Sequence, residues 1–339
     1  MTIYDYSKEE LENYFLNRNE KKFKATQIFT WLYQKKVNNY SDMTDIKKDT
    51  LSYLEKELPI TRVKKINVER DKDVNKYLFE LDDKEHIEAV LMRHDYGNSI
   101  CVSSQVGCNM GCRFCESGRR KKVRNLTAGE MVTQVLEVED DIKERITHVV
   151  LMGIGEPFDN YNEIIKFIKI INDSKGLAIG SRHITVSTSG IVPKIDEFSN
   201  LPLQVNLAIS LHAPTDELRN SIMPINKAYP LSQLMASVKR YLQKTNRRVT
   251  FEYILLKGIN DTLECAQELS RLLKGINCYV NLIPYNETEN IQYERSKMFQ
   301  IMKFYDILKK NNINVTIRRE FGSKISAACG QLRSKKEEL

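Results

Sequence analysis

The sequence predicts an α/β protein whose main domain is a partial (β/α)6 barrel, preceded by a small helical domain and a β-hairpin. Strand-like runs alternate with helical stretches from about residue 97 onward. Such alternation is typical of right-handed βαβ units and a parallel sheet. The units are too few for a complete eight-fold barrel. Polar and glycine residues follow the predicted strands, where barrel enzymes carry their reactive groups.

The first part of the chain predicts a helical accessory domain over residues 1–60. It is rich in Lys, Glu, Leu and Tyr, and its apolar residues recur at helical intervals. Two basic segments, Lys21–Lys24 and Lys35–Lys36, interleave with Tyr14, Trp31 and Tyr33. Cations and rings together can contact phosphates and stack on bases. A solvated face over an ordinary aromatic core explains the same pattern.

Residues 61–96 change to short β-like runs over Lys76–Leu81 and Glu88–Met92, separated by the turn-like Asp82–Lys84. We expect a hairpin that leads into the barrel domain, residues 97–310. Residues 311–339 then form a C-terminal strand and tail. The predicted strands are Ser99–Ser103, Thr147–Met152, His183–Ser187, Val205–Leu211, Val249–Leu255, Tyr279–Ile283 and Val315–Arg318. The predicted helices are Ala128–Glu144, Tyr161–Asn172, Leu231–Lys244, Thr262–Leu273 and Ser296–Asn311.

After the first barrel strand, Cys108, Cys112 and Cys115 fall at C-x3-C-x2-C spacing. Three thiolates can hold three irons of a [4Fe–4S] cluster, and because no fourth cysteine follows, one iron is left open. With Phe114 before the last cysteine, the segment resembles the motif of radical S-adenosylmethionine (SAM) enzymes, whose open iron binds SAM and whose cofactor carries the radical chemistry. A zinc site, which needs four ligands, and buried cysteines without any ligand role are the alternatives.

Polar groups at the other strand ends are candidates for binding SAM. Glu156 offers a carboxylate to the SAM ammonium, and the preceding glycines let the backbone come close to a ligand. Serine, histidine and asparagine can hydrogen-bond the carboxylate, ribose or adenine. His148 and His183 are interpreted as structural. The candidate cofactor-binding residues are Gly155, Glu156, Ser187, Ser210, Leu211, His212 and Asn286.

The bulk properties favour a cytoplasmic protein. Basic residues exceed acidic ones by 52 to 45, a formal charge of +7 that is compatible with a polyanionic partner without requiring one. The seven cysteines lack the spacing of a secreted disulfide scaffold, and an oxygen-sensitive cluster needs a reducing compartment. Neither a signal peptide nor an apolar run of membrane-spanning length is evident, so we expect no membrane contact.

Two further cysteines stand apart from the cluster motif. Cys101 lies on the strand that enters the cluster loop, and Cys329 lies near the end of the chain. Either could be a small buried hydrophobe. The basic segment Thr316–Arg319 precedes Cys329, and nearby cations lower a thiol pKa and favour the nucleophilic thiolate. Cys329 is therefore equally well interpreted as reactive.

The whole chain resembles the RlmN/Cfr family of radical SAM RNA methyltransferases. The resemblance rests on several motifs that occur in the same order along the chain. These are Cys101–Cys108, Met152–Pro157, Ser210–Pro214, Met223–Asn226, Asn281–Asn286 and Ala327–Leu332.

The resemblance implies a catalytic role for three residues. Cys329 is methylated by one SAM, and a second SAM gives the radical that takes hydrogen from this S-methyl group, so two SAM are used per turnover. The carbon radical adds to an sp2 carbon of adenine, and Cys101 then attacks the sulfur of Cys329, leaving a transient disulfide that must be reduced. Glu88 matches the base that removes the adenine proton. Glu85 fits the family spacing less well. Without the resemblance, Glu88 is interpreted as a surface residue.

The implied substrate is C2 of an adenosine in the peptidyl-transferase centre of 23S rRNA, with a tRNA anticodon-loop adenosine as a second candidate. The segments Gly153–Asn160 and Ser187–Gly190 favour this RlmN-like reaction. The alternative is Cfr-type methylation of C8 of the same adenosine, which confers antibiotic resistance. We expect a monomer served by a reducing partner such as flavodoxin or ferredoxin. An RNA-binding protein with a purely structural cluster, and a radical SAM enzyme with a protein or small-molecule substrate, are rival interpretations.

The segment after Cys115 departs from the family pattern. Glu116 beside the cluster could lower its reduction potential or point into solvent. The basic residues Arg119–Arg124 could grip RNA phosphates or form a solvated loop. This departure bears on substrate choice more than on reaction type.

Overall fold

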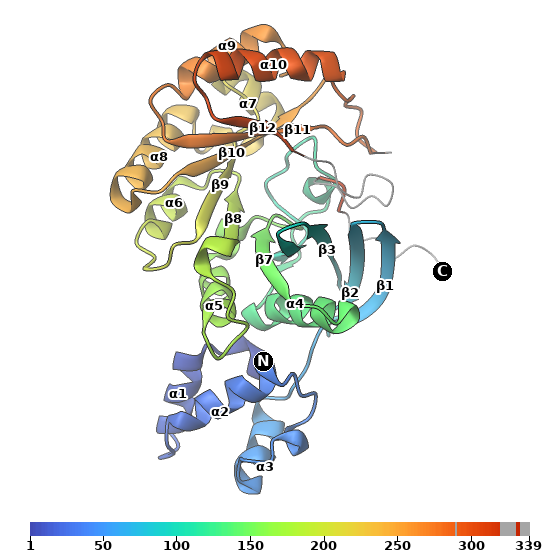
Figure 1. Cartoon of the computed structure of the whole chain (residues 1–339), viewed down its shortest axis with the longest axis vertical. Helices are drawn as coiled ribbons and strands as arrows, with labels where there is room; N and C mark the ends of the chain where they lie inside the picture. Colours follow the sequence, from blue (N-terminus) through green and yellow to red (C-terminus); the bar gives the residue numbers. More distant parts are fainter. Residues whose placement is uncertain (289, 319–329, 333–339) are drawn as a thin grey trace.

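The computed structural model describes residues 1–288, 290–318 and 330–332. One sheet organises it, with the strands in the order β1-β2-β3-β4-β7-β8-β9-β10-β11-β12 (Figure 1). From β4 to β12 all neighbours are parallel, whereas β1 to β4 pair antiparallel. The strands are β1 (Lys64–Asp71), β2 (Val74–Glu80), β3 (His86–His94), β4 (Gly97–Cys101), β7 (Ile146–Leu151), β8 (Ile184–Thr188), β9 (Asn206–Ser210), β10 (Val249–Leu255), β11 (Cys278–Pro284) and β12 (Val315–Ile317). A separate small sheet pairs β5 (Gln105–Val106) with β6 (Arg124–Asn125).

Helices cover the outer face of the parallel strands, as right-handed crossovers require. Three of them begin with a threonine, Thr127, Thr215 or Thr262, whose side chain accepts from a backbone N–H of the first turn. Thr127 accepts from the Glu130 backbone N–H at 3.1 Å, and Glu130 accepts from the Thr127 N–H at 2.9 Å, a capping box that fixes the start of α4. The helices of this layer are α4 (Ala128–Ile142), α5 (Tyr161–Asn172), α6 (Val192–Phe198), α7 (Asp216–Ile222), α8 (Leu231–Thr245), α9 (Leu263–Leu272) and α10 (Met298–Lys310).

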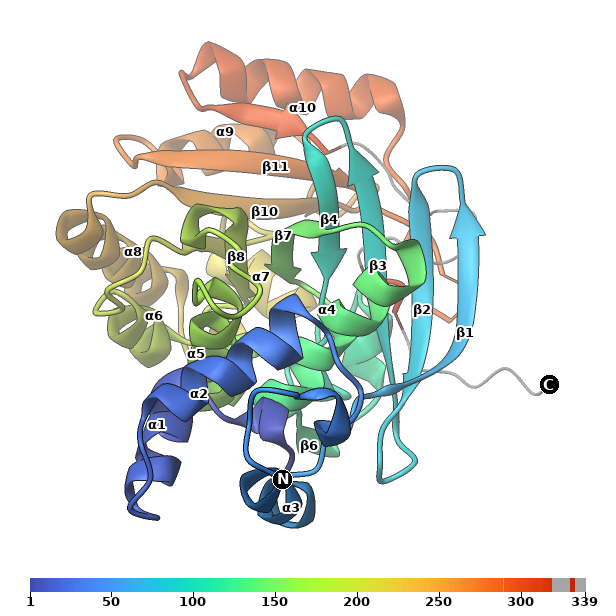
Figure 2. The same ribbon diagram turned by 60° about the horizontal axis from the view of Figure 1, so that its bottom comes forward.

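The predicted partial barrel is confirmed, and every strand and helix predicted for it is present, with each end within two residues of its predicted position. The prediction missed α6 and α7, whose seven residues are too short for a clear helical period. It also missed β1, so the expected hairpin is a three-stranded antiparallel unit. This unit is hydrogen-bonded to β4 and extends the barrel sheet itself, as Figure 2 shows at the side of the molecule.

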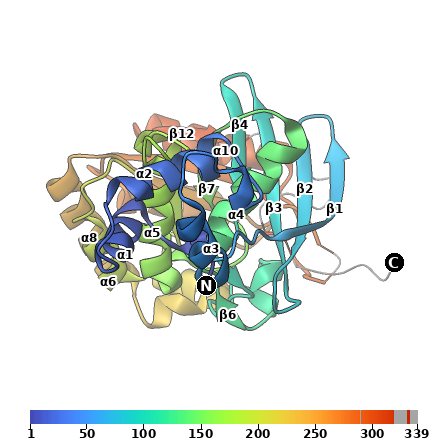
Figure 3. The ribbon, with the colours of Figure 1, turned by 90° about the horizontal axis from the view of Figure 1, so that it is seen from below.

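The N-terminal residues form the predicted helical domain, which packs beneath α4 and α5 (Figures 1 and 3). It is anchored by Asp5, which accepts from the Gly129 N–H at 3.0 Å, and by Arg62, whose guanidinium lies 2.6 Å from Asp140. Tyr33 is a buried core ring, whereas Phe23 is 53% exposed. Its helices are η1 (Ile3–Asp5), α1 (Lys8–Leu16), α2 (Phe23–Phe29), the π-helical η2 (Thr30–Gln34), η3 (Tyr40–Asp42) and α3 (Lys48–Glu57).

None of the helices within residues 1–288, 290–318 and 330–332 has both the length and the apolar character needed to cross a membrane.

Candidate active site at the carboxyl ends of the strands

One cavity lies where the carboxyl ends of the parallel strands converge. Cys108, Cys112 and Cys115 line it from the loop that follows β4 and β5. Strand ends and the loops that follow them supply the opposite wall. The predicted cofactor-binding residues in the lining are Gly155, Glu156, Ser187, Ser210 and His212. The structure therefore brings the predicted thiols and most of the predicted polar groups into one site.

The cysteine loop is held in a compact conformation by its own backbone. The Cys115 N–H donates to the Cys112 carbonyl at 3.2 Å, and the Cys108 N–H donates to Arg120 O at 2.9 Å. Gly111 has φ +65°, a left-handed conformation that favours glycine. Burial raises the pKa of Cys108 to about 12 and raises that of Cys112 as well. Neutral thiols therefore predominate until a metal favours the thiolate.

The donor set fits an iron–sulfur cluster better than a single ion. Within the described residues, no three His, Cys, Asp or Glu side chains form a group that could hold one metal ion. A [4Fe–4S] cluster needs a different arrangement of ligands, because each thiolate binds a different iron atom. Three thiols that line one cavity, on a loop fixed by backbone hydrogen bonds, meet that need.

Glu156 is a buried carboxylate held by backbone donors. Its Oε2 accepts from the Ser189 N–H at 2.7 Å, and its Oε1 accepts from the Phe158 N–H at 3.0 Å. Burial raises the pKa of Glu156, while the hydrogen bonds from Ser189 oppose the shift. Each carboxylate oxygen has a further lone pair. Glu156 can therefore accept an ammonium donor from a ligand in the cavity.

Gly155 lies directly before this carboxylate, in a conformation that only glycine tolerates. Its φ is +111°, and an added Cβ would lie 2.7 Å from the Gln105 Cβ and 2.8 Å from the Ser104 Oγ. The loop after β7 thus packs tightly against the segment that leads into the cysteine loop. Gln105 ties the two together, since its Oε1 accepts from the Glu156 N–H at 2.8 Å.

His212 is a neutral imidazole that faces the cavity. Its Nδ1 accepts from the Ile254 N–H at 3.0 Å, so its proton lies on Nε2. The ring meets Phe114 edge-to-face, with centroids 4.8 Å apart and planes at 82°. Burial lowers the pKa of His212 to about 3, and Arg219 adds to the shift. His212 is therefore a hydrogen-bond donor at neutral pH.

This shifted pKa predicts a pH-dependent stability. Between pH 6.5 and 3, the unfolded chain protonates His212 and the folded chain does not, so the free energy of unfolding falls as pH falls. We expect His212 to lower it by about 2 kcal/mol between pH 7 and pH 5. Urea unfolding of the parent and His212→Asn chains at both pH values measures this difference. Equal pH dependence in the two chains would contradict it.

Leu211 and Asn286, also predicted to bind the cofactor, do not line the cavity. Leu211 is fully buried in the core, and its backbone N–H donates to Glu252 O at 3.1 Å. Asn286 is buried, and its Oδ1 has no hydrogen-bond partner among the described residues. Both follow lining strands closely, so any cofactor contact they make remains a prediction.

The structure also adds lining residues that were not among the predicted cofactor-binding residues: Glu252 of β10, Thr188 at the end of β8 and Ser189 directly after it. The Glu252 Oε1 accepts from the Asn281 Nδ2 at 2.9 Å, and its Oε2 lies 3.9 Å from the Arg318 guanidinium. Burial raises the pKa of Glu252, and Arg318 opposes the shift. Only the two-residue alternation along β10, once the inner face is known, could have indicated Glu252.

Cys101 lies in a small apolar cluster on the inner face of the sheet. It pairs with Val90 of β3 across the antiparallel ladder. In the same cluster lies Leu332, from the end of the chain. The tail is held there by hydrogen bonds from the Glu116 N–H to Gly330 O at 2.9 Å and from the Ser117 Oγ to Leu332 O at 2.8 Å.

Cys329 lies outside the described residues, so its predicted role stays a prediction. The residue after it, Gly330, lines the cavity together with the three cysteines of the cluster motif. Gln331 is also fixed there, because its Nε2 donates to Glu287 O at 3.1 Å. The described part of the tail thus reaches the candidate site.

Glu88 is buried on β3 and is not the surface residue that its neighbours in the sequence suggest. It lies on the same face of β3 as Val90, two residues along. Its Oε1 is 3.8 Å from the Lys76 Nζ. It is absent from the cavity lining, and its catalytic role stays a prediction. Glu85 instead pairs with Arg120 at 2.5 Å.

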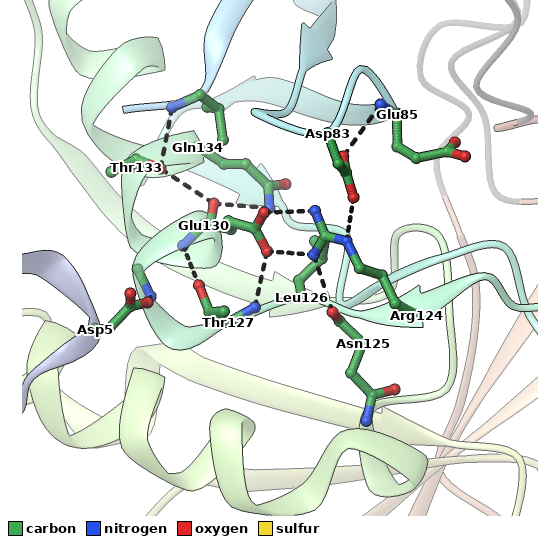
Figure 4. Close-up of polar contacts among 12 residues, drawn as sticks. Asp5, Asp83, Glu85, Arg124, Asn125, Leu126, Thr127, Glu130, Thr133 and Gln134 are labelled. Atoms are coloured by element: carbon green, nitrogen blue, oxygen red, sulfur yellow. Dashed lines mark hydrogen bonds and ion pairs between the residues drawn. The ribbon is translucent and has the colours of Figure 1, made fainter. Parts of the chain in front are cut away.

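The loop after Cys115 is less available to RNA than its charge suggests. Glu116 is buried and does not point into solvent. Arg124 donates to both carboxylate oxygens of Glu130, at 2.8 and 2.7 Å, and pairs with Asp83 (Figure 4). Lys122 pairs with Asp159 at 2.6 Å. Much of the basic run therefore forms ion pairs that hold this loop against the turn between β2 and β3, the start of α4 and the segment before α5.

Comparison with known proteins gives two family matches. The model described as "Radical SAM superfamily" matches residues 102–271, and the model described as "Ribosomal RNA large subunit methyltransferase N-terminal domain" matches residues 1–60. A protein of Enterococcus faecalis named "Probable dual-specificity RNA methyltransferase RlmN" is 55% identical, over 98% of this chain and 96% of its own. A protein of the same name from Geobacillus kaustophilus is 54% identical, over 98% and 93%.

Among solved structures, a radical SAM methyltransferase from Sphaerobacter thermophilus is similar over almost the whole chain. Its TM-score is 0.94 at 43% sequence identity, and the match covers 99% of this chain and 100% of that one.

Proposed function

The chain belongs to the RlmN/Cfr family of radical SAM RNA methyltransferases, and from that premise we propose that it methylates C2 of an adenosine in the peptidyl-transferase centre of 23S rRNA. An adenosine in the tRNA anticodon loop is the proposed second substrate. The name "dual-specificity" carried by the relatives supports two RNA substrates. The observation that carries the proposal is the meeting of the three thiols, Glu156 and Gly330 at one cavity.

Cys108, Cys112 and Cys115 would hold the [4Fe–4S] cluster and leave one iron for SAM. When bound, the cluster and SAM supply a one-electron reductive cleavage, which furnishes the radical that removes a hydrogen atom from a methyl group. Glu156 would accept the SAM ammonium, and the His212 Nε2–H and the Ser187 and Ser210 hydroxyls would orient the rest of the cofactor.

The chain's own thiols carry the one-carbon unit in this proposal. The Cys329 thiol loses its proton and takes the methyl group of one SAM by displacement, which leaves S-adenosylhomocysteine. After the hydrogen atom is removed with a second SAM, the methylene carbon bonds to C2 of the adenine. The placement of Gly330 in the cavity lining and of Leu332 in the cluster that holds Cys101 supports the assignment of both thiols to one site.

Release requires a base and a second thiol. Glu88 takes the proton from the substituted carbon, and the adduct radical gives up one electron, which would return to the bound cluster, so that the aromatic ring is restored. The Cys101 thiolate then attacks the Cys329 sulfur, so that an S–S bond forms, the S–C bond breaks, and the released carbon takes up a proton as the new methyl group. A reducing partner such as flavodoxin or ferredoxin supplies electrons, and we propose that the enzyme works in the cytoplasm as a monomer.

The helical domain, residues 1–60, is proposed to add an RNA contact away from the cavity. Phe23 is 53% exposed, and the exposed Lys21 and Lys22 precede it. An exposed ring between cations can stack on a base while the charges meet phosphates.

The test is anaerobic reconstitution of the enzyme with iron, sulfide and methyl-labelled SAM, followed by nucleoside analysis of 23S rRNA and tRNA. We expect labelled 2-methyladenosine in both RNAs. Labelled 8-methyladenosine without 2-methyladenosine would overturn the C2 assignment in favour of the C8 reaction. Cleavage of SAM without any labelled nucleoside would overturn the RNA substrate.

A further inference from the structure

A second hollow lies on the surface of the protein, beside the cysteine loop, and it is open to solvent. The described residues that line this hollow are Gly111, Cys112, Arg113, Gly118, Arg119 and the segment Asn290–Tyr293. Among the described residues, the lining of the hollow and the lining of the cavity share one member, Cys112. Cys112 therefore stands between the candidate cluster site and the surface.

Two glycines keep the protein thin at this point. Gly111 precedes Cys112 and places no side chain over it. Gly118 packs directly against the Cys112 backbone, since an added Cβ would lie 2.9 Å from the Cys112 O and 3.1 Å from its N. The Arg113 N–H donates to Ile222 O at 3.0 Å, which fixes the loop beyond Cys112. A redox group that enters the hollow thus comes within one residue of a cluster bound by Cys112.

The described lining of the hollow contains two cations and no acid. Arg113 and Arg119 are exposed, and none of the nine described lining residues is Asp or Glu. Arg119 is held in place, because its Nη1 donates to Asn290 O at 3.1 Å and lies 3.7 Å from the Glu116 Oε2. Arg113 forms no ion pair with a residue that the structure describes. A partner with a negatively charged surface is therefore complementary to this lining.

Apolar side chains accompany these charges. Ile291 and Tyr293 line the hollow and are half-buried. Tyr293 meets Tyr285 edge-on, with centroids 6.2 Å apart and planes at 86°, and packs on the apolar cluster that contains Phe114. Aromatic residues and arginine are enriched in protein–protein interfaces. Transient redox complexes need only a small interface, so a hollow of this kind is sufficient for one.

We propose that this hollow is the docking surface for the reducing partner, a small acidic protein that carries an electron on a flavin or an iron–sulfur centre. The inference rests on the proposed function, because it assumes a cluster bound through Cys112. In each encounter the reduced centre of the partner loses one electron to the cluster, and the partner leaves oxidised by one electron. RNA is the less suitable occupant, since its target base has to enter the cavity, whereas the hollow lies on the surface side of Cys112.

The test mixes the reconstituted holoenzyme with flavodoxin hydroquinone in an anaerobic stopped-flow instrument and follows the absorbance of the cluster, without RNA or SAM. We expect Arg113→Glu to lower the second-order rate constant about tenfold at low salt, since a reversed charge slows association. The rate constant of the parent should fall as salt is added. Arg113→Lys, which keeps the charge, should stay within about twofold of the parent. Dithionite, a small reductant that needs no docking surface, should reduce all variants alike.

Arg182→Glu is the matched control, because Arg182 is an exposed arginine directly before β8, at the amino ends of the strands, and flavodoxin should reduce this variant like the parent. Equal rate constants for Arg113→Glu and the parent would overturn the docking surface and leave the proposed function standing. Weaker RNA binding by Arg113→Glu, with unchanged reduction by flavodoxin, would assign the hollow to RNA instead. A parent that flavodoxin reduces through Arg113 but that methylates no RNA would overturn the proposed function alone.

Discussion

Replacing Cys101 by alanine should stop the reaction with the RNA still bonded to the enzyme. In the proposed sequence, every step up to carbon–carbon bond formation uses Cys329, and only the release step uses Cys101. Leu332 lies in the same small apolar cluster as Cys101, so the described end of the tail is near the thiol that would attack Cys329. Without that thiol, no other nucleophile of the proposed sequence can break the S–C bond.

Denaturing electrophoresis of labelled RNA measures this outcome. Cys101→Ala should give a protein-linked RNA band and less than one equivalent of methylated nucleoside per enzyme. Cys101→Ala combined with Cys329→Ala should give neither. Cys278→Ala is the matched control, since Cys278 is an equally buried thiol at the start of β11, and it should turn over normally. Catalytic turnover by Cys101→Ala would remove Cys101 from the release step.

Local pattern was enough to predict the barrel strands, because each is a short apolar run bounded by polar or glycine residues. The predicted bounds of α5 and β10 are those of the structure. The pairing of β1–β3 with β4 was not predicted, since it depends on long-range hydrogen bonds that no local pattern encodes. A strand with an exposed face such as β1 also has little apolar alternation to detect.

The candidate site shows the same limit: residues marked by local spacing or position were predicted, and residues identified only by the tertiary fold were not. The thiols and the strand-end groups Glu156 and Ser187 were predicted because spacing or position marks them. Glu252 was missed because it lies within a strand, where nothing local separates a cavity-facing carboxylate from a surface one. The basic loop was misjudged as a possible free surface because one of the two acidic partners of Arg124 is remote in the sequence: Asp83 is 41 residues away, whereas Glu130 is 6 away.

Arg219, likewise missed by sequence inspection, is a fully buried positioning residue behind the cavity. Its guanidinium donates to the carbonyls of three residues and to one side chain. The distances are 2.6 Å to Ser189 O, 3.1 Å to Ser210 O, 3.0 Å to Leu211 O and 3.0 Å to the Asn226 Oδ1. Burial lowers the pKa of Arg219 to about 10, which leaves the group charged at neutral pH. This one guanidinium thus connects the loop after β8 with the loop after β9, and both loops line the cavity.

Arg219→Met should loosen both loops and weaken cofactor binding. It leaves three buried carbonyls without this donor, and each unsatisfied acceptor costs about 1–3 kcal/mol. We expect the free energy of unfolding to fall by about 3 kcal/mol or more. SAM affinity of the reconstituted enzyme should fall at least about tenfold, which corresponds to about 1.4 kcal/mol.

Arg219→Lys separates positioning from charge and from folding. Lysine keeps the positive charge, but its single ammonium cannot reproduce the planar fork that reaches several carbonyls at once. This variant should therefore fold with a normal circular dichroism spectrum and still lose SAM affinity. Arg240→Met, which removes a surface guanidinium paired with Asp196 at 2.6 Å, should bind SAM like the parent. Full SAM affinity in Arg219→Lys would show that the charge alone suffices, and the loops would then owe their geometry to Gln105 and Glu156 rather than to the guanidinium fork.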